Sequence, residues 1–467
     1  MPARTESDAL GEMEVPAEAY YGIHTMRSLQ NFPISGRRHH ARFIEAYALI
    51  KKAAAQTNRD LGLLDEGIAD AICRACDEVL DQKLRDQFVV DVFQMGAGTS
   101  FHMNVNEVLA NRAIEILGGE KGDYDRVNPN DHVNMAQSTN DTFPTAMRVS
   151  ARLLLDELLP VLDGLRDALG AKGQEFDGIV KAGRTHLQDA VPIRLGQEFA
   201  AYAQAIAKAS ARLRQSAEGL EELGLGGSAV GTGINVHPDY SRRAIGLLAE
   251  WTGLAFRPAE DLREAMQSQM CIADASAALK LLALELIRIS ADLRLLSSGP
   301  TTGLGEIALP PVQPGSSIMP GKINPSMAEM LGMVCFYVVG SDVAVGMAAQ
   351  AGQLELNVFM PVMAYCLLDS IEVLKNGVRE FVERCIKGIV ADGEQCRRYA
   401  ESTVAMATAL NPYVGYAKAA EIAKQAARTG KTIREVAAEQ GLLDPDLLDR
   451  ILDPKPLTEP GLPGEEK

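Results

Sequence analysis

The chain has 467 residues, of which 47% are hydrophobic, and a formal net charge of −16 at pH 7. This length gives room for about three domains of ordinary size, and this share of hydrophobic residues supplies a buried core. The negative charge argues against a nucleic-acid partner, because proteins that bind the phosphate backbone need a positive face.

The seven cysteines are odd in number and scattered along the chain, which does not fit the disulfide framework of a secreted protein. Neither they nor the histidines have the spacing of metal ligands, so no metal site is predicted. The first ten residues have no apolar run after a basic start, and charged residues interrupt the long helical stretches. The sequence therefore predicts a cytoplasmic protein without a signal peptide or a membrane span.

The first third of the chain is expected to be helical after an irregular start. Residues 1–40 contain several turn formers and little helical periodicity, and they predict an irregular arm. From Ala41 onward, apolar residues recur every three or four positions, and residues 63–84 continue this amphipathic pattern. The polar stretch 118–134 is expected to be a connector, and helical patterning returns at Thr145.

Three long periodic segments follow and predict a helix bundle. They are residues 194–222, 259–297 and 325–389, the last expected to bend near Gly340 and Gly352. The second segment carries leucine and isoleucine on nearly every side. A helix of this kind must be surrounded by its own chain or by other subunits. The pattern therefore predicts a homo-oligomer whose helices pack across subunits.

The C-terminal part is expected to form small helices, at 412–428 and 432–440, followed by a disordered Pro/Gly/Glu-rich tail after Asp453. The predicted fold class is mainly α. The predicted domains are an N-terminal helical domain (1–139), a central helix bundle (140–392) and a small C-terminal helical domain with a disordered tail (393–467).

Four polar segments combine hydroxyl, amide and glycine residues just before helical stretches. They are 96–107 (GAGTSFHMNVNE), 137–146 (QSTNDTFPTA), 183–192 (GRTHLQDAVP) and 314–329 (PGSSIMPGKINPSMAE). Helix N-termini present unpaired N–H groups and the positive end of the helix dipole, so several that converge would bind an anion. Taken singly, such residues are more often helix caps. The fourth segment is the strongest candidate, because glycines, prolines and a lysine are typical of a mobile lid.

The donors in these segments suit a small dicarboxylate. Two carboxylates need hydroxyl, amide and N–H donors and one cation. The candidates are Thr99, Ser138, Thr139, Asn140, Thr185 and Lys322. A single central lysine, together with Arg184, suits a modest pocket and not a polyphosphate site.

The fourth segment carries a specific family resemblance. Residues 315–325 (GSSIMPGKINP) closely match the signature loop of the aspartase/fumarase superfamily, and the other three segments match in the same order. The chain resembles that superfamily over nearly its whole length. The resemblance implies a three-domain, mainly α subunit with a central long-helix bundle, in a homotetramer whose sites are shared between subunits. It also implies chemistry without a cofactor.

Within the superfamily, the motifs divide between two reactions. Residues 15–28, GAGTS and QSTND are similar to aspartases, whereas residues 226–238 are closer to fumarases. The resemblance therefore implies conversion of L-aspartate to fumarate and ammonia, with a class II fumarase acting on L-malate as the alternative. A non-catalytic structural relative is the third possibility. Thr301 replaces the arginine usual in both families, and His102 replaces asparagine; both departures bear on the choice of substrate.

The resemblance also assigns roles in removing the β-proton through an enediolate intermediate. The β-carboxylate is assigned to Thr99, Ser138, Thr139 and Ser317. The α-carboxylate is assigned to Thr185, Lys322 and Asn324, and the amino group to Asn140 and His186. The implied base is Ser316, acting as an alkoxide when the loop closes around it with the charge of Lys322. The competing base is His186 paired with Glu329, a more conventional arrangement.

Overall fold

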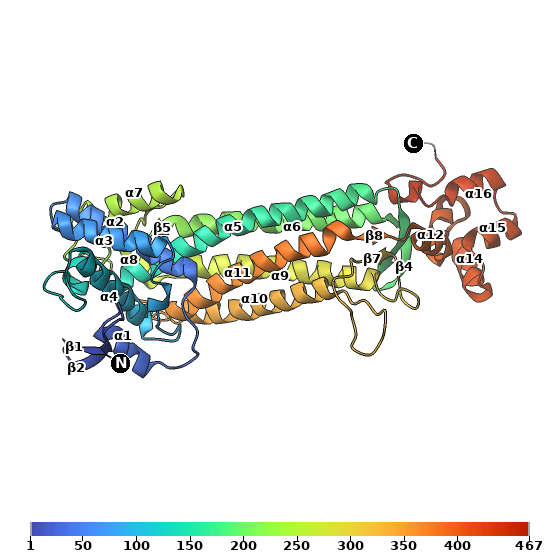
Figure 1. The fold of residues 1–467 in the computed structure, drawn as a ribbon. Helices are drawn as coiled ribbons and strands as arrows, with labels where there is room; N and C mark the ends of the chain where they lie inside the picture. Colours follow the sequence, from blue (N-terminus) through green and yellow to red (C-terminus); the bar gives the residue numbers. More distant parts are fainter. Residues whose placement is uncertain (1, 466–467) are drawn as a thin grey trace. The chain divides into compact units, whose positions relative to one another are not determined.

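The computed structural model describes residues 2–465 as a mainly helical chain, which confirms the predicted fold class (Figure 1). Its contacts form two compact units, each made of segments that are distant in the sequence. Unit 1 comprises Met1–Leu159, Ala211–Ala283 and Cys335–Lys375, and unit 2 comprises Pro160–Ser210, Leu284–Val334 and Asn376–Lys467. The division into three domains stays a prediction.

Unit 1 contains the N-terminal elements and several short elements from residues 222–267. In chain order they are β1 (Ala3–Asp8), β2 (Gly11–Pro16), α1 (Ile23–Asn31), α2 (Ala41–Asp60), α3 (Glu66–Leu80), η1 (Arg85–Gln87), η2 (Gly96–Gly98), α4 (Thr99–Ile116), the π-helix η3 (Pro129–Val133), β5 (Glu222–Leu223), α7 (Tyr240–Thr252), β6 (Arg257–Pro258) and α8 (Leu262–Gln267).

The prediction of an irregular arm at residues 1–40 is wrong. Strands β1 and β2 form an antiparallel hairpin, and α1 follows it. The strands are largely polar, so hydrophobic periodicity did not reveal them. The buried carboxylate of Glu107 on α4 accepts hydrogen bonds from the backbone N–H groups of Gly22, His24 and Thr25 at 2.8–3.1 Å. A distant residue therefore caps α1, which has no side-chain cap of its own.

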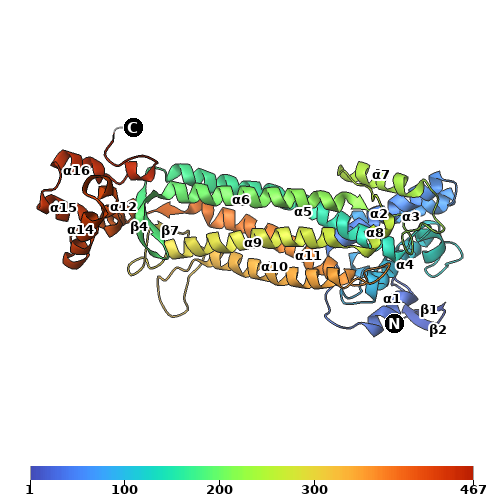
Figure 2. The same ribbon diagram turned by 180° about the vertical axis from the view of Figure 1, so that it is seen from behind.

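Five long helices each contribute residues to both units. They are α5 (Thr139–Glu175), α6 (Leu195–Glu218), α9 (Met270–Leu296), α10 (Ser326–Gln350) and α11 (Met360–Arg384). Within each unit, the segments of these helices that belong to it lie side by side (Figures 1 and 2). The expected bend at Gly340 is wrong, because α10 continues through it. The helix ends before Gly352, where the Asn357 side chain donates to the carbonyls of Ala348 and Ala349 at 2.9 and 3.1 Å.

Helix α10 is unusually apolar and unusually exposed. Phe336, Val343 and Met347 are 62%, 63% and 62% exposed. By length and composition alone, α10 is the one helix within residues 2–465 that could cross a membrane, although only 33% of its most apolar window is buried. The sequence argument against a membrane span was that charged residues interrupt the long helices, but α10 contains too few charged residues for that argument to apply. A helix of an oligomer core has the same composition.

Unit 2 contains the β3–β4 hairpin (Val180–Thr185 and Gln188–Arg194) and the C-terminal helices. The other elements of unit 2 are β7 (Ile307–Ala308), η5 (Ile386–Gly388), β8 (Val390–Ala391), α12 (Gly393–Ser402), η6 (Val404–Leu410), α13 (Asn411–Val414), α14 (Tyr416–Thr429), α15 (Ile433–Gln440), α16 (Pro445–Ile451) and η7 (Pro456–Thr458). The short helix η4 (Gly219–Glu221) belongs to unit 1.

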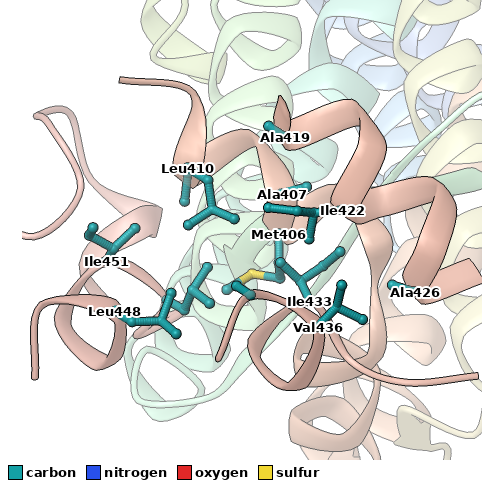
Figure 3. Packing of buried hydrophobic residues seen from close by; sticks show 13 residues of the cluster. Met406, Ala407, Leu410, Ala419, Ile422, Ala426, Ile433, Val436, Leu448 and Ile451 are labelled. Atoms are coloured by element: carbon teal, nitrogen blue, oxygen red, sulfur yellow. The ribbon is translucent and has the colours of Figure 1, made fainter. Parts of the chain in front are cut away.

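The C-terminal helices share a small hydrophobic core. Met406, Leu410, Ile422 and Ile433 belong to it, and their side chains gather between the surrounding helices in Figure 3. The tail expected to be disordered makes defined contacts within unit 2, including hydrogen bonds from Arg194 to Thr458 and from Gln197 to the Thr458 carbonyl. Residues 466 and 467, which the same expectation covered, lie outside the described residues.

Candidate active site

The predicted site residues are divided between the two units, and the structure defines each group by itself. Unit 1 holds Thr99, Ser138, Thr139 and Asn140. Unit 2 holds Thr185, His186, Ser316, Ser317, Lys322 and Asn324. All of them lie in or beside the four polar segments.

In unit 1, the first two polar segments pack directly against each other. Thr99 begins α4 after a tight turn in which Ala97 and Gly98 have φ values of 62° and 89°. A Cβ atom at Gly98 would lie 2.0 Å from the Phe143 ring on α5. Glycine is therefore required here by both the positive φ and the close approach of the α4 turn to α5.

Asp141 holds the second polar segment in place. Its side chain is fully buried, and it accepts hydrogen bonds from the backbone N–H groups of Ser138 at 2.9 Å and of Gly226 and Ser228 at 3.0 Å. Burial raises the pKa of Asp141 to about 6, although these three hydrogen bonds lower it. Asp141 therefore connects the loop that carries Ser138 to a chain segment 85 residues away.

The polar side chains around Asp141 differ in the hydrogen bonds that they already form. The Asn140 amide donates to the carbonyl of Ala229 at 2.8 Å, so one of its donors already has a protein partner. The Ser138 hydroxyl accepts from the Asn140 backbone N–H at 3.2 Å. The Thr139 hydroxyl lies 2.7 Å from Nδ1 of His102, the residue that departs from the family pattern.

In unit 2, Thr185 and His186 lie at an exposed hairpin turn. His186 and Leu187 form the two-residue turn between β3 and β4, with φ values of 55° and 57°. Positive φ at both positions matches the twist of a tight hairpin. The third polar segment, residues 183–192, was expected to lie directly before a helix. It forms the β3–β4 hairpin instead, and α6 begins only at Leu195.

Arg184 is part of a buried ion-pair cluster. Its guanidinium donates to both carboxylate oxygens of Glu306 at 3.0 Å. Glu306 is fully buried and also lies 3.2 Å from the ammonium of Lys181. The charge of Arg184 therefore has a carboxylate partner within the same chain, which weakens the sequence argument that it supplies a cation to a ligand.

The signature loop is closed at its base by its own backbone. The Gly315 N–H donates to the Lys322 carbonyl at 2.8 Å, and the Asn324 amide donates to the Gly315 carbonyl at 2.7 Å. A Cβ atom at Gly315 would lie 2.6 Å from the Lys322 carbonyl oxygen, so only glycine fits. Ser317 and Lys322 are exposed on this loop, and α10 begins directly after it at Ser326.

Ser316 sits inside the loop turn. Its hydroxyl oxygen accepts hydrogen bonds from the backbone N–H groups of Ile318 at 3.2 Å and Met319 at 2.9 Å. Donors aimed at an oxygen favour its ionised form over its neutral form. These two donors would stabilise negative charge on the Ser316 oxygen if the hydroxyl ionised.

The competing pair of His186 and Glu329 is not formed in the described part of this chain. Among residues 2–465, no hydrogen bond or ion pair joins these two side chains, and Glu329 lies 4.0 Å from Arg294. The same part of the chain contains no group of three His, Cys, Asp or Glu side chains that could hold a metal ion.

Comparisons with known proteins show the family of the chain. A family model described as Lyase matches residues 11–340, and one described as Fumarase C C-terminus matches residues 406–459. An aspartate ammonia-lyase of Bacillus subtilis is 48% identical over 463 residues, covering 99% of this chain and 98% of that relative. A class II fumarate hydratase of Halobacterium salinarum is 50% identical over 460 residues, covering 98% of both proteins.

A solved structure supports the same relationship. The fumarate lyase:delta crystallin of Brucella melitensis, bound to cobalt, has a TM-score of 0.95 at 48% identity, covering 98% of this chain and 100% of that chain. The matches extend over nearly the whole length and include both the helical body and the C-terminal helices. The chain therefore belongs to the aspartase/fumarase superfamily of lyases.

Proposed function

We propose that this lyase converts L-aspartate to fumarate and ammonia. The observation that carries the proposal is the turn in which the Ser316 hydroxyl accepts two backbone N–H groups, in the same loop as Lys322. Several aspartate ammonia-lyases, including that of Bacillus subtilis, are 46–48% identical to the chain over nearly its full length. Their shared activity supports ammonia as the leaving group.

The proposed reaction begins with proton transfer to a Ser316 alkoxide from the β-carbon of the substrate. The electron pair of the C–H bond moves into the β-carboxylate and forms an enediolate. Its collapse forms the carbon–carbon double bond and breaks the C–N bond, so that the substrate ammonium leaves as ammonia. Preorganised donors around the developing charge supply much of the stabilisation.

Each predicted site residue receives one role in this proposal. The β-carboxylate is bound by Thr99, Ser138, Thr139 and Ser317. The α-carboxylate is bound by Thr185, Lys322 and Asn324, and the amino group faces Asn140 and His186. No cofactor and no metal ion takes part. His186 with Glu329 stays the alternative base, for which a second subunit would have to complete the pair.

The test is to incubate the purified chain separately with L-aspartate and L-malate and to follow fumarate by its absorbance. We expect fumarate from L-aspartate, with one ammonia released per fumarate. The class II fumarase reading is favoured by the 50% identity to the Halobacterium salinarum hydratase. Formation of fumarate from L-malate alone would select that reading, and no reaction with either substrate would support a non-catalytic relative.

The proposed assembly is a homotetramer with sites shared between subunits, in the cytoplasm. The exposed apolar side chains of Phe336, Val343 and Met347 lie along α10 and offer a surface for other subunits. All seven cysteines are free, which supports a reducing compartment.

Replacing Phe336 with glutamate is expected to dissociate this assembly and to remove activity, because a charge would be buried in an apolar contact. Light scattering after size-exclusion chromatography measures the mass. Leu10→Glu is the matched control, since Leu10 is 80% exposed on the β1–β2 turn. A Phe336→Glu chain that keeps its mass and activity would contradict the proposed use of α10.

A further inference from the structure

Lys51 on α2 is a buried lysine surrounded by neutral acceptors. Its ammonium lies 2.7 Å from Nε2 of His102, 3.1 Å from Oδ1 of Asn134 and 2.8 Å from Oε1 of Gln137. The residue is 0% exposed, and burial lowers its pKa to about 7. Within residues 2–465, no carboxylate forms a hydrogen bond or ion pair with it. Burying a charge that no carboxylate contacts is costly, although the buried carboxylate of Asp141 attracts the Lys51 ammonium through space and raises its pKa.

The neighbouring amides can only accept from Lys51. The Gln137 amide nitrogen donates to the carbonyls of Val133 and Met135 at 3.2 and 3.1 Å. The Asn134 amide nitrogen donates to the Gln137 carbonyl at 3.2 Å. Both amide oxygens therefore face Lys51. The three contacts of its ammonium match its three N–H donors.

This arrangement fixes the proton on the His102 ring. When Lys51 carries its charge it can only donate, so Nε2 accepts from it and the proton of the neutral ring is on Nδ1, which lies 2.7 Å from the Thr139 hydroxyl. The ring is fully buried, and burial holds its pKa well below the usual range, so it stays neutral. The Thr142 hydroxyl, 3.5 Å from Nε2, uses its own hydrogen on the Ser138 carbonyl.

The Thr139 hydroxyl therefore receives a hydrogen bond from His102 and keeps its own hydrogen. In the described part of the chain it has no other hydrogen-bond partner. A threonine hydroxyl that accepts on one side is free to donate on the other. Its orientation is set by His102 directly and by Lys51 through the His102 ring.

We propose that Lys51 and His102 are positioning residues that hold the Thr139 hydroxyl as a donor to the substrate carboxylate. The inference rests on the proposed function, which places Thr139 at the β-carboxylate. The enediolate concentrates negative charge on that group, so an oriented donor stabilises it more than it stabilises the ground state. The Lys51 ammonium adds a positive charge at the far end of the same hydrogen-bonded chain.

Two substitutions at His102 separate positioning from simple space filling. Asparagine places an amide near the position of Nδ1 and can still donate to Thr139, whereas leucine has a similar volume and no donor. We expect His102→Leu to lower kcat/KM about tenfold, the size of one lost hydrogen bond, and His102→Asn to recover most of that loss. A purely structural role predicts that the apolar leucine does at least as well.

A double-mutant cycle tests whether the effect passes through Thr139. Thr139→Val alone should cost about as much as His102→Leu, and the double variant should lose no more than about twofold beyond either one. Lys51→Met should couple to Thr139→Val in the same way. Thr145→Val is the matched control, since this buried hydroxyl on α5 bonds only the Asp141 carbonyl. It should leave the effect of His102→Leu unchanged.

Affinity for succinate, measured by calorimetry on the intact chain and the same variants, gives a readout that needs no turnover. Weaker binding by His102→Leu than by His102→Asn supports the inference even if neither L-aspartate nor L-malate reacts, a result that would contradict only the proposed function. Equal losses for leucine and asparagine, additive losses with Thr139→Val, or no succinate binding by the unchanged chain would overturn the inference.

Discussion

Replacing Ser316 with alanine is expected to lower kcat for L-aspartate by about 10⁴-fold, near the upper limit for a single general base. The reason is the loss of the oxygen that takes the β-proton in the proposed reaction. Steady-state fumarate formation measures the effect. Ser326→Ala is the matched control, because Ser326 lies at the start of α10 and, among residues 2–465, its hydroxyl has a single hydrogen bond, to the Asn324 carbonyl at 3.4 Å.

Ser316 also organises its own turn, so binding must be measured beside turnover. Its oxygen accepts from Ile318 and Met319, and alanine would remove both hydrogen bonds. We expect succinate affinity to fall only a few fold, since the contacts of Gly315 with Lys322 and Asn324 remain. If Ser316→Ala keeps more than a tenth of the activity of the unchanged chain, the base is His186, and His186→Ala should then show the large loss.

The helical body and the signature loop could be predicted from local sequence signals. Residues 315–325 form one continuous motif, and the α15 helix begins with a Thr432 cap and a Glu435 partner that can be read directly from the sequence. The start of α10 after Asn324 and Pro325 has the same local character. Such elements depend on neighbouring residues, which is why pattern alone is sufficient.

The buried polar contacts could not be predicted in the same way. Lys51 occurs four residues after Tyr47 on the apolar face of α2, which is a weak signal, but its partners lie up to 86 residues away. The pairing of Arg184 with Glu306 spans 122 residues. Each of these contacts depends on tertiary packing, and no spacing rule connects the partners. Arg184 therefore looked like a free cation in the sequence.

A second large effect is expected at Asp141. Asp141→Ala leaves three backbone N–H groups without an acceptor: that of Gly226, whose hydrogen bond is buried, and those of Ser138 and Ser228, whose hydrogen bonds are part-buried. We expect the free energy of unfolding to fall by about 3 kcal/mol, because an unsatisfied donor costs about 1–3 kcal/mol when it is buried. Chemical denaturation followed by circular dichroism measures it. Asp156→Ala on the same helix is the control, since the Asp156 side chain is 62% exposed and its ion pair with Arg152 should contribute little.

The free energy of unfolding of Asp141→Asn should lie between that of the unchanged chain and that of Asp141→Ala, because the amide oxygen can replace only part of the carboxylate. The pH dependence adds a sharper test. Burial raises the folded-state pKa of Asp141 from 3.8 to about 6, so its protonation favours the folded state. That stabilisation is complete below pH 3.8 and is lost as the pH rises through 6. The advantage of the unchanged chain over Asp141→Asn should therefore widen between neutral pH and pH 4, and a constant difference would mean that the carboxylate does not titrate in this window.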